Sequence, residues 1–422
     1  MDELYTLFDS SVDLRHLTAG DHPPLFHFIL GLINPQDSII IARTSMLLIA
    51  LLTLLAFLWA LKPLGREGTL LGLVFLASNP LLINYGIEIR MYGLLVLLTC
   101  LVLGELVRLR AGPHDSHTYI RLVVWLVLAT QTHAVGIFLA TTSLFILLMP
   151  PKRSRPGGLL CGTLILVPTL STLGWMWVYR MKDKLANTAW IDHPSFQKVF
   201  KQTANLFLGR DAPNGEIVTV LFLLLVSIFL IAFLGHGGVP YLAGGLFYCG
   251  QILLFSLLLK PILLDRTLLP CVPFLAAFLA IRYQSIVHRR RLSRALLLLT
   301  ITYAVGSAGL WVFRNSQLCK TPIKHVLVPI ANTIKPDSYL VADWALTPLP
   351  YFYFPNHPEE KITTSNPHNP DPRQLPGPGT VYLILRTDPE VEIPELRRAL
   401  RRDRLETVLF RSADFEIYRF QD

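Results

Sequence analysis

Two acidic residues, Asp2 and Glu3, follow the first methionine, and Asp21 and His22 occur further along the same amino-terminal segment. A carboxylate beside a hydroxyl group can take its proton while the oxygen attacks an electrophile, which is general-base chemistry. A fraying chain end positions such groups poorly. Acids are also favoured at a solvated helix start by the helix dipole, and this structural alternative is the stronger one for Asp2 and Glu3 taken alone.

Glu88 and Arg90 lie in a short polar stretch, residues 80–92, between two apolar runs. Ionisable groups at membrane depth are energetically costly, and they usually pair, face a cavity or take part in function. Gly86 permits a tight turn here. A structural ion pair that closes the turn and a functional role are both open, and Tyr92 is expected either to share such a role or to pack.

His133 lies at the outer end of one apolar run, and Arg266 begins another. A lone membrane histidine usually packs as a hydrogen-bonded residue, and an arginine at a membrane boundary usually snorkels towards the interface. Guanidinium and imidazole groups are also strong hydrogen-bond donors, so a functional role is open for both residues. The sequence contains no dinucleotide-binding fingerprint and no P-loop, which agrees with a substrate that is not a nucleotide.

These residues are set among segments that are too apolar for a soluble protein. The chain has 422 residues, of which 52% are hydrophobic and 16% are charged, and this composition indicates a polytopic membrane protein. A long run over residues 119–149 is interrupted at Gln131–His133 and is expected to form two short spans or a hairpin, which brings the total to ten membrane segments. The other runs are 38–61, 68–84, 91–108, 157–179, 216–234, 239–259, 267–287 and 293–313.

The charge distribution predicts the topology. Residues 1–314 carry 25 basic and 15 acidic side chains, whereas residues 315–422 carry 13 and 14. Basic residues in short loops mark the cytoplasmic side, so residues 1–37, the turn near 85–90, the loop 181–215 and the tail are predicted to be extracytoplasmic. The basic excess therefore reflects topology and does not indicate nucleic-acid binding. The loops in question contain Lys62 and Arg66, then Arg108, Arg110 and Arg121, then Lys152, Arg153 and Arg155, and finally Arg289, Arg290, Arg291 and Arg294.

The amino-terminal segment has no signal-peptide pattern, although the charge distribution places it outside the cytoplasm. We therefore expect a further transmembrane helix before Met1. Residues 3–17 and 23–34 are predicted to be short interfacial or re-entrant helices, because each has an apolar face and neither is long enough to span.

Residues 1–314 are predicted to form the membrane domain, and residues 315–422 a small α/β domain outside the membrane. Helices are expected over 322–334 and 394–404, and strands over Tyr339–Ala342, Val381–Leu385 and Phe415–Phe420. Residues 363–379 are rich in proline and asparagine and are expected to form a loop. The five cysteines form neither a disulfide framework nor a metal-binding pair.

The order of these motifs resembles the glycosyltransferase C superfamily over roughly residues 1–290. The resemblance is carried by the Asp-Glu pair, the Asp-His-Pro-Pro-Leu segment, the Pro-Leu-Leu-Ile-Asn-Tyr turn with its Glu-x-Arg-Met-Tyr, the Thr-His span, and the Arg-x-Leu-Leu-Pro span before an outer tail. It is nearest to the branch of the protein O-mannosyltransferases and the aminoarabinose transferase of lipid A. This resemblance implies an all-α polytopic fold, and a first helix directly before the Asp-Glu pair.

The resemblance further implies transfer of a sugar from a polyprenyl phosphate to an envelope glycan, lipid or protein hydroxyl, generally with inversion at the anomeric carbon. Asp2 matches the catalytic acid of the family and is the candidate base. Glu3 is expected to orient Asp2, bind the acceptor or contact a cation. A divalent cation is used by some members, but no ligand spacing here requires one, so the cofactor is undetermined. The predicted substrate-binding set is Asp21, His22, Glu88, Arg90, Tyr92, His133 and Arg266, in which the two arginines face the phosphate and the two histidines support it.

Two other functions are compatible with the sequence. Buried charges also line the paths of polytopic transporters and lipid flippases, although such proteins often contain internal repeats and none is convincing here. A catalytically inactive relative is the third alternative. In every case the protein is expected in the plasma membrane, in contact with membrane lipid.

Overall fold

A computed structural model describes residues 23–33, 39–112, 116–150, 158–178, 193–209, 215–317, 334, 337–343, 358, 361–365, 380–386, 405–411 and 415–421. The chain divides into two compact units, a helical unit within residues 9–314 and a smaller unit that contains residues 315–422. Each unit is described by itself below.

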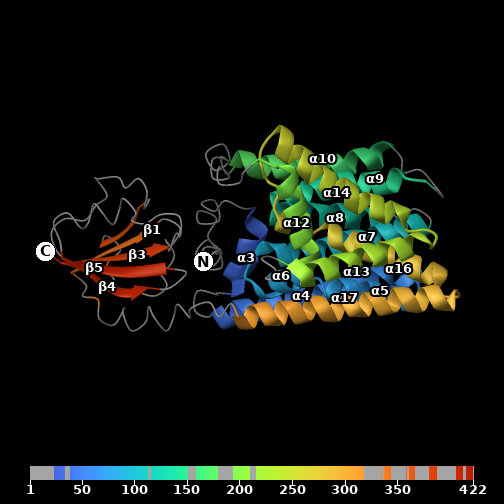
Figure 1. Ribbon diagram of the computed structural model, residues 1–422. Helices are drawn as coiled ribbons and strands as arrows, with labels where there is room; N and C mark the ends of the chain where they lie inside the picture. The colour runs from blue at the N-terminus through green and yellow to red at the C-terminus, as the bar shows by residue number, and fades with distance from the viewer. Residues whose placement is uncertain are drawn as a thin grey trace. The chain divides into compact units, whose positions relative to one another are not determined.

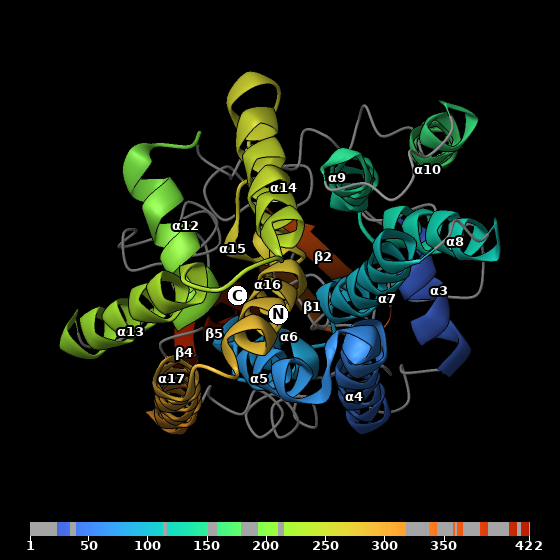
Figure 2. The same cartoon turned by 90° about the vertical axis from the view of Figure 1, so that its right-hand side faces the viewer.

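The helical unit is a bundle of apolar helices that run side by side (Figure 1). In the end-on view, α7 lies between α4 and α8, and α16 lies between α5 and α14 (Figure 2). The helices are α3 (Pro24–Ile33), α4 (Ile39–Leu61), α5 (Arg66–Ala77), α6 (Pro80–Ile87), α7 (Met91–Ala111), α8 (Ser116–Thr132), α9 (Ile137–Leu148), α10 (Gly158–Val178), α12 (Phe196–Leu208), α13 (Gly215–Phe233), α14 (Val239–Leu258), α15 (Asp265–Leu268), α16 (Cys271–Ile286) and α17 (Arg290–Gln317), with short 3-10 helices η2 (Lys62–Leu64) and η3 (Ala134–Gly136).

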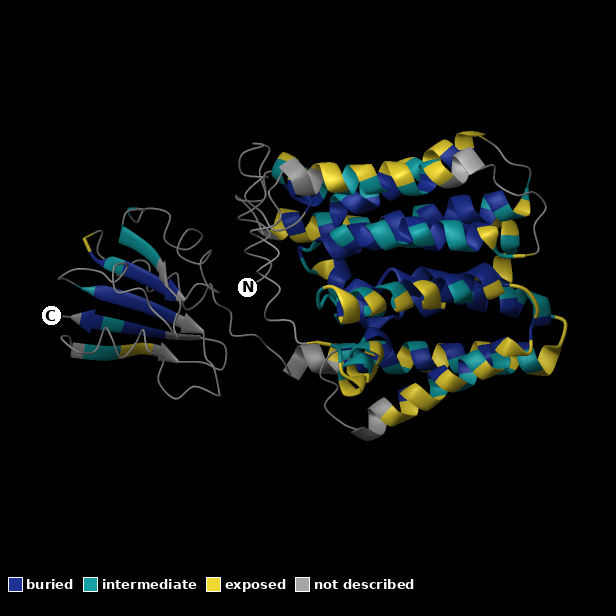
Figure 3. Ribbon diagram, turned by 90° about the horizontal axis from the view of Figure 1, so that it is seen from above, coloured by how far each residue is buried: buried dark blue, intermediate teal, exposed yellow. Residues whose placement is uncertain are grey.

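Within the described residues, four helices are long and apolar enough to cross a membrane, namely α4, α7, α14 and α17. The bent pair of α5 and α6 passes the same test as one span, and shorter apolar helices fill most of the remaining predicted runs. Exposed residues follow the outward faces of the bundle, while buried residues face its interior (Figure 3). Large apolar side chains are prominent on those outward faces. Such a surface is suited to lipid, and the predicted all-α polytopic membrane fold is confirmed.

The run 68–84, predicted as one helix, is broken. The chain bends by 67° between α5 and α6. The side chain of Asn79 accepts a hydrogen bond from the Leu82 amide at 2.9 Å, and Pro80 occupies the first position of α6, so a new helix starts there. Gly86 lies inside α6 and does not form the turn, which follows at residues 88–90.

The predicted interruption of the run 119–149 is confirmed, because α8 ends at Thr132 and α9 begins at Ile137. Gly136 lies between them, where an added Cβ atom would come within 2.4 Å of the Ala129 carbonyl oxygen. Only glycine fits this approach without moving the backbone. The apolar segment predicted at 23–34 is helix α3, and the segment predicted at 3–17 lies outside the described residues.

Two hydrogen bonds attach the break between α5 and α6 to its neighbours, and a third joins α17 to the end of α12. Asn79 Nδ2 donates to the Leu206 carbonyl at 2.8 Å, and the Ser307 hydroxyl donates to the Ser78 carbonyl at 2.9 Å. The Tyr303 hydroxyl donates to the Phe207 carbonyl at 2.6 Å. Side chains of α17 therefore satisfy one carbonyl at the break and one at the end of α12, and Asn79 satisfies a second carbonyl of α12, as lipid-embedded backbone requires.

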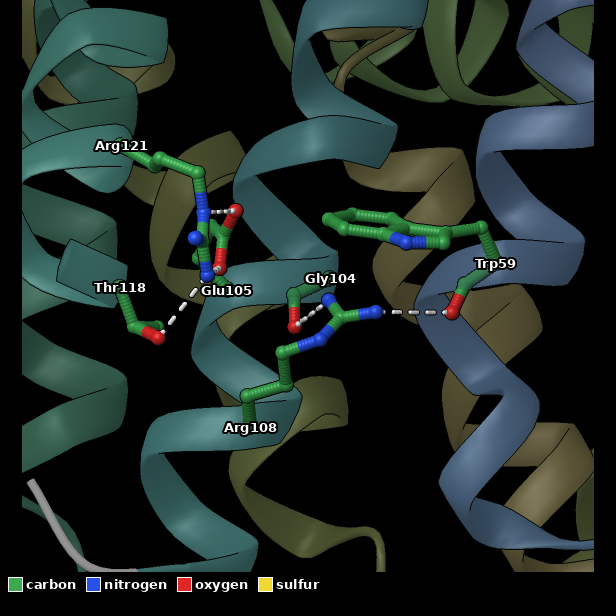
Figure 4. A network of polar contacts seen from close by, with 6 residues as sticks. All are labelled: Trp59, Gly104, Glu105, Arg108, Thr118 and Arg121. Atoms are coloured by element: carbon green, nitrogen blue, oxygen red, sulfur yellow. Dashed lines mark hydrogen bonds and ion pairs between the residues drawn. The ribbon is translucent and has the colours of Figure 1, made fainter. Parts of the chain in front are cut away.

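A charged network lies towards the carboxyl end of α7 (Figure 4). The fully buried Glu105 carboxylate pairs with the Arg121 guanidinium of α8, with Oε1 at 2.8 Å from Nε. Arg108, one turn further along α7, stacks over the Trp59 ring with its guanidinium carbon 3.5 Å from the ring centroid. These contacts connect α7 to α8 and α4 by charge as well as by packing.

The smaller unit contains a five-stranded sheet in the order β2-β1-β3-β5-β4. The strands are β1 (Tyr339–Asp343), β2 (Ile362–Ser365), β3 (Val381–Arg386), β4 (Leu405–Arg411) and β5 (Phe415–Gln421). Strand β1 is parallel to both β2 and β3, whereas β5 is antiparallel to β3 and β4. Its buried core consists of Val341, Val381, Leu383, Tyr418 and Phe420.

The three predicted strands of this unit are confirmed as β1, β3 and β5. The predicted loop over 363–379 is wrong at its start, because residues 362–365 pair with β1 as a strand. Strand β4 was not predicted, since its charged and apolar residues resemble the end of the preceding helical pattern. The helices predicted over 322–334 and 394–404 lie outside the described residues, apart from residue 334.

Candidate active site

Five of the nine predicted site residues fall within the described part of the chain. They belong to the turn between α6 and α7, the start of α7, the break between α8 and α9, and the short helix α15. These residues are Glu88, Arg90, Tyr92, His133 and Arg266. The other four, Asp2, Glu3, Asp21 and His22, lie outside the described residues, so their positions remain predictions.

Tyr92 is the centre of a cluster that draws on four elements. Its ring centroid lies 5.0 Å from that of Tyr85 in α6 and 5.2 Å from the imidazole of His133. The guanidinium carbon of Arg266 is 5.8 Å from the Tyr92 centroid, and that of Arg90 is 5.8 Å from the Tyr85 centroid. The structure therefore places two guanidinium groups and one imidazole around a pair of tyrosine rings.

Glu88 and Arg90 form the ion pair that the structural alternative predicts. Arg90 Nε lies 3.3 Å from Glu88 Oε2, and the other carboxylate oxygen accepts a hydrogen bond from Asn84 Nδ2 at 3.0 Å. Both charged side chains are largely buried, with 13% of Arg90 and 20% of Glu88 exposed. The carboxylate thus orients the guanidinium at the start of α7. A structural ion pair and a functional role for Arg90 are therefore compatible.

His133 occupies the bend between α8 and α9. Its Nδ1 accepts a hydrogen bond from the Val135 amide at 3.1 Å, and the side chain is 8% exposed. Since Nδ1 acts as an acceptor, the neutral imidazole carries its proton on Nε2. His133 therefore carries its hydrogen-bond donor on the ring nitrogen opposite the one that faces the Val135 amide.

A compact hydrogen-bonded turn positions Arg266. The Arg266 amide donates to Asp265 Oδ1 at 2.7 Å, and the Asp265 amide donates to Gln202 Oε1 of α12 at 2.6 Å. The Tyr248 hydroxyl of α14 donates to the Thr267 carbonyl at 3.1 Å. Asp265 is 2% exposed, so this turn is fixed from inside the bundle.

Three residues of this arrangement were not in the predicted set. Tyr85 and Asp265 lie directly within the motifs that carry Glu88 and Arg266, and their proximity in sequence was a usable signal. Gln202 belongs to α12, in a region predicted only as a loop. Nothing in the sequence pairs it with Asp265, because the contact depends on how α12 packs against α15.

The described residues contain no group of three or more His, Cys, Asp or Glu side chains that could hold a metal ion. The described cluster contains two guanidinium groups, one of them paired with the Glu88 carboxylate, and aromatic rings. Guanidinium groups bind phosphate through charge and a planar fork of donors, and aromatic rings restrict their orientation. The arrangement is therefore suited to an anionic, phosphate-bearing group.

No protein-family model matches the chain, and no curated protein matches it by sequence. The structure, however, is similar to that of ArnT from Cupriavidus metallidurans in the apo state, with a TM-score of 0.61 at 14% identity, over 99% of this chain and 93% of ArnT. The same protein bound to undecaprenyl phosphate gives a TM-score of 0.62 at 12% identity, with the same coverage. At this identity the likeness shows a shared fold across both units.

Proposed function

We propose that this protein is a membrane glycosyltransferase that moves a sugar from a polyprenyl phosphate to a hydroxyl group of an envelope glycan, lipid or protein. The observation that carries the proposal is the placement of Arg90 and Arg266 around the Tyr85 and Tyr92 rings at one end of a membrane bundle. The similar fold of ArnT, which was solved with undecaprenyl phosphate bound, supports this choice of ligand.

The reaction needs stabilisation of negative charge on the leaving group. The acceptor oxygen forms a bond to the anomeric carbon, while the bond between that carbon and the phosphate oxygen breaks. Its electron pair leaves with the phosphate, where Arg90, Arg266 and the Nε2 proton of His133 offset the charge. Asp2 takes the proton of the acceptor hydroxyl, and direct attack inverts the anomeric configuration.

The membrane side of this chemistry follows from the charge distribution. The site end of the bundle is where α6 meets α7 and α15 precedes α16, and the basic loops lie at the opposite helix ends. We therefore infer an extracytoplasmic site. A cysteine introduced at residue 190 should react with an impermeant maleimide in intact cells, and protection of that cysteine would contradict the orientation.

A lipid flippase is the second candidate, because broken helices such as α5–α6 and α8–α9 also build transporter sites. The two functions differ in their products. A flippase returns the lipid-linked sugar intact, whereas a transferase releases polyprenyl phosphate and glycosylates an acceptor.

Binding of undecaprenyl phosphate to the purified full chain tests the site directly. We expect Arg90→Gln and Arg266→Gln each to weaken binding by about tenfold or more, because each removes a charged phosphate contact. Arg289→Gln is the matched control, since this exposed arginine lies at the opposite end of α16. Equal affinity in all variants would refute the assignment of the phosphate site.

A further inference from the structure

We infer that α12 is an interfacial helix whose apolar face enters the bilayer and whose lysines bind anionic phospholipid headgroups, next to the Arg266 turn. The inference concerns the bulk membrane lipid and goes beyond the proposed transfer reaction.

The apolar face of α12 is uncovered at its amino-terminal half. Phe196 and Phe200 lie one turn apart, and 87% and 57% of their surfaces are exposed. Further along the same face Phe207 is buried in the bundle, as are its neighbours Leu206 and Leu208. The helix is therefore anchored at one end and projects its aromatic residues at the other, in agreement with its position at the margin of the end-on view (Figure 2).

The uncovered face continues the lipid-facing surface of α13. The ring centroids of Phe200 and Phe222 are 6.3 Å apart, and Phe222 belongs to the apolar helix α13. Its neighbours Val220 and Leu223 are more than half exposed, as expected for side chains that face hydrocarbon. Because Phe200 contacts this surface, the lipid hydrocarbon that covers α13 also reaches the aromatic face of α12.

The polar face of α12 is basic. Lys198 and Lys201 lie on the side away from Phe196 and Phe200 at helical spacing, and the helix contains no acidic residue. A helix with aromatic residues on one face and lysines on the other lies in the plane of the membrane interface. Its charge is complementary to phosphate headgroups, and anionic lipid attracts such lysines across a short distance.

Two hydrogen bonds connect α12 to the elements of the candidate site. Gln202, one residue after Lys201, accepts the hydrogen bond from the Asp265 amide. Leu206, one turn later, accepts the bond from Asn79. Lipid contacts on α12 would therefore restrain the same two elements that carry Arg266 and lead into Arg90.

Hydrogen exchange of the full chain in lipid nanodiscs tests the inference without reference to activity. We expect amides of residues 196–208 to exchange about 25-fold more slowly when phosphatidylglycerol is added to phosphatidylcholine, because each of the two lysines near an anionic surface changes binding by roughly fivefold. Lys198→Gln combined with Lys201→Gln should abolish the difference, and glutamine retains the helix propensity. Arg289→Gln with Arg290→Gln, the same charge change at the far end of α16, should leave it intact.

A second variant separates the apolar contact from the charge. Phe196→Ser with Phe200→Ser should speed exchange of α12 in both lipid compositions while leaving the response to phosphatidylglycerol in place. Equal exchange in the two compositions for the wild-type chain would overturn the inference, as would a lipid response that persists in the double lysine variant. Equal protection in detergent and in both nanodiscs would show that another protein surface covers α12, and would also overturn it.

Discussion

The guanidinium carbon of Arg266 lies 5.8 Å from the centre of the Tyr92 ring, although α7 and α15 are far apart in sequence. This contact joins the start of one membrane helix to the turn before another. It also brings Arg266 into the ring cluster that contains His133 and, through Tyr85, Arg90. A phosphate held by both arginines would lie against this aromatic pair.

Replacement of Arg266 by lysine should not preserve function. Lysine keeps the charge, but it lacks the planar fork that can bind two phosphate oxygens and stack on Tyr92. We expect Arg266→Lys to lower the rate of sugar transfer by about 100-fold, as for loss of one transition-state donor. Steady-state kinetics with undecaprenyl-phosphate-linked pentoses and hexoses would measure this change, and wild-type rates in Arg266→Lys would argue against a bidentate role.

Two substitutions of Tyr92 separate the contribution of its ring to ligand binding from that of its hydroxyl group. Tyr92→Phe keeps the surface that contacts Arg266 and His133, whereas Tyr92→Leu removes it. If stacking positions Arg266, affinity for undecaprenyl phosphate should remain near wild type in Tyr92→Phe and fall by about fivefold in Tyr92→Leu. An equal loss in both variants would instead identify the hydroxyl group as the phosphate or sugar contact.

Asn79 uses both ends of its side-chain amide at the break between α5 and α6. Its oxygen caps α6 and its nitrogen donates to the Leu206 carbonyl. Asn79→Asp keeps the cap and loses the donor, while Asn79→Ala loses both. We expect Asn79→Ala to lower the free energy of unfolding by roughly 2–3 kcal/mol, the sum of one cap and one unpaired buried carbonyl. Thermal unfolding in detergent checks the value, and an unchanged midpoint for Asn79→Ala would show that the break needs no cap.

The Glu105–Arg121 pair is expected to support the fold and not the chemistry. Arg121→Gln leaves a fully buried carboxylate without its cation, which should cost about 3 kcal/mol of stability. The double change with Glu105→Gln should recover part of this loss, because no charge is then left buried. Thermal unfolding of the two variants gives the comparison. Undecaprenyl phosphate binding measured well below the unfolding midpoint should match wild type, and a specific loss of binding would contradict a purely structural role.

The polar side chains of the cluster could be predicted because charge inside an apolar run is conspicuous. Glu88, Arg90, His133 and Arg266 each interrupt or flank such a run, and the structure gathers them at one end of the bundle. Hydrocarbon tolerates few ways of burying such groups, so their convergence follows from the physics of the membrane. The hydrogen-bond and ring contacts of these residues could not be predicted in the same way.

The contacts that fix the cluster depend on packing between distant segments. Gln202 reaches Asp265 only because α12 folds against α15, and an amphipathic helix alone does not specify its neighbour. The bend at Asn79 had a local signal, an asparagine followed by proline, but the length of the apolar run favoured one continuous span. In the smaller unit, β2 was missed because the residues after it are rich in proline and asparagine.

Transfer by proteoliposomes of the protein, supplied with undecaprenyl-phosphate-linked sugars and a cell-envelope extract, tests the central claim most directly. The measurement is the release of undecaprenyl phosphate together with the appearance of the sugar on an acceptor, for the wild-type chain and for Asp2→Asn. The wild-type chain is expected to show both products, and Asp2→Asn should lose at least about 100-fold in rate through loss of its base. Translocation of intact donor without release of undecaprenyl phosphate, or full transfer by Asp2→Asn, would contradict the account.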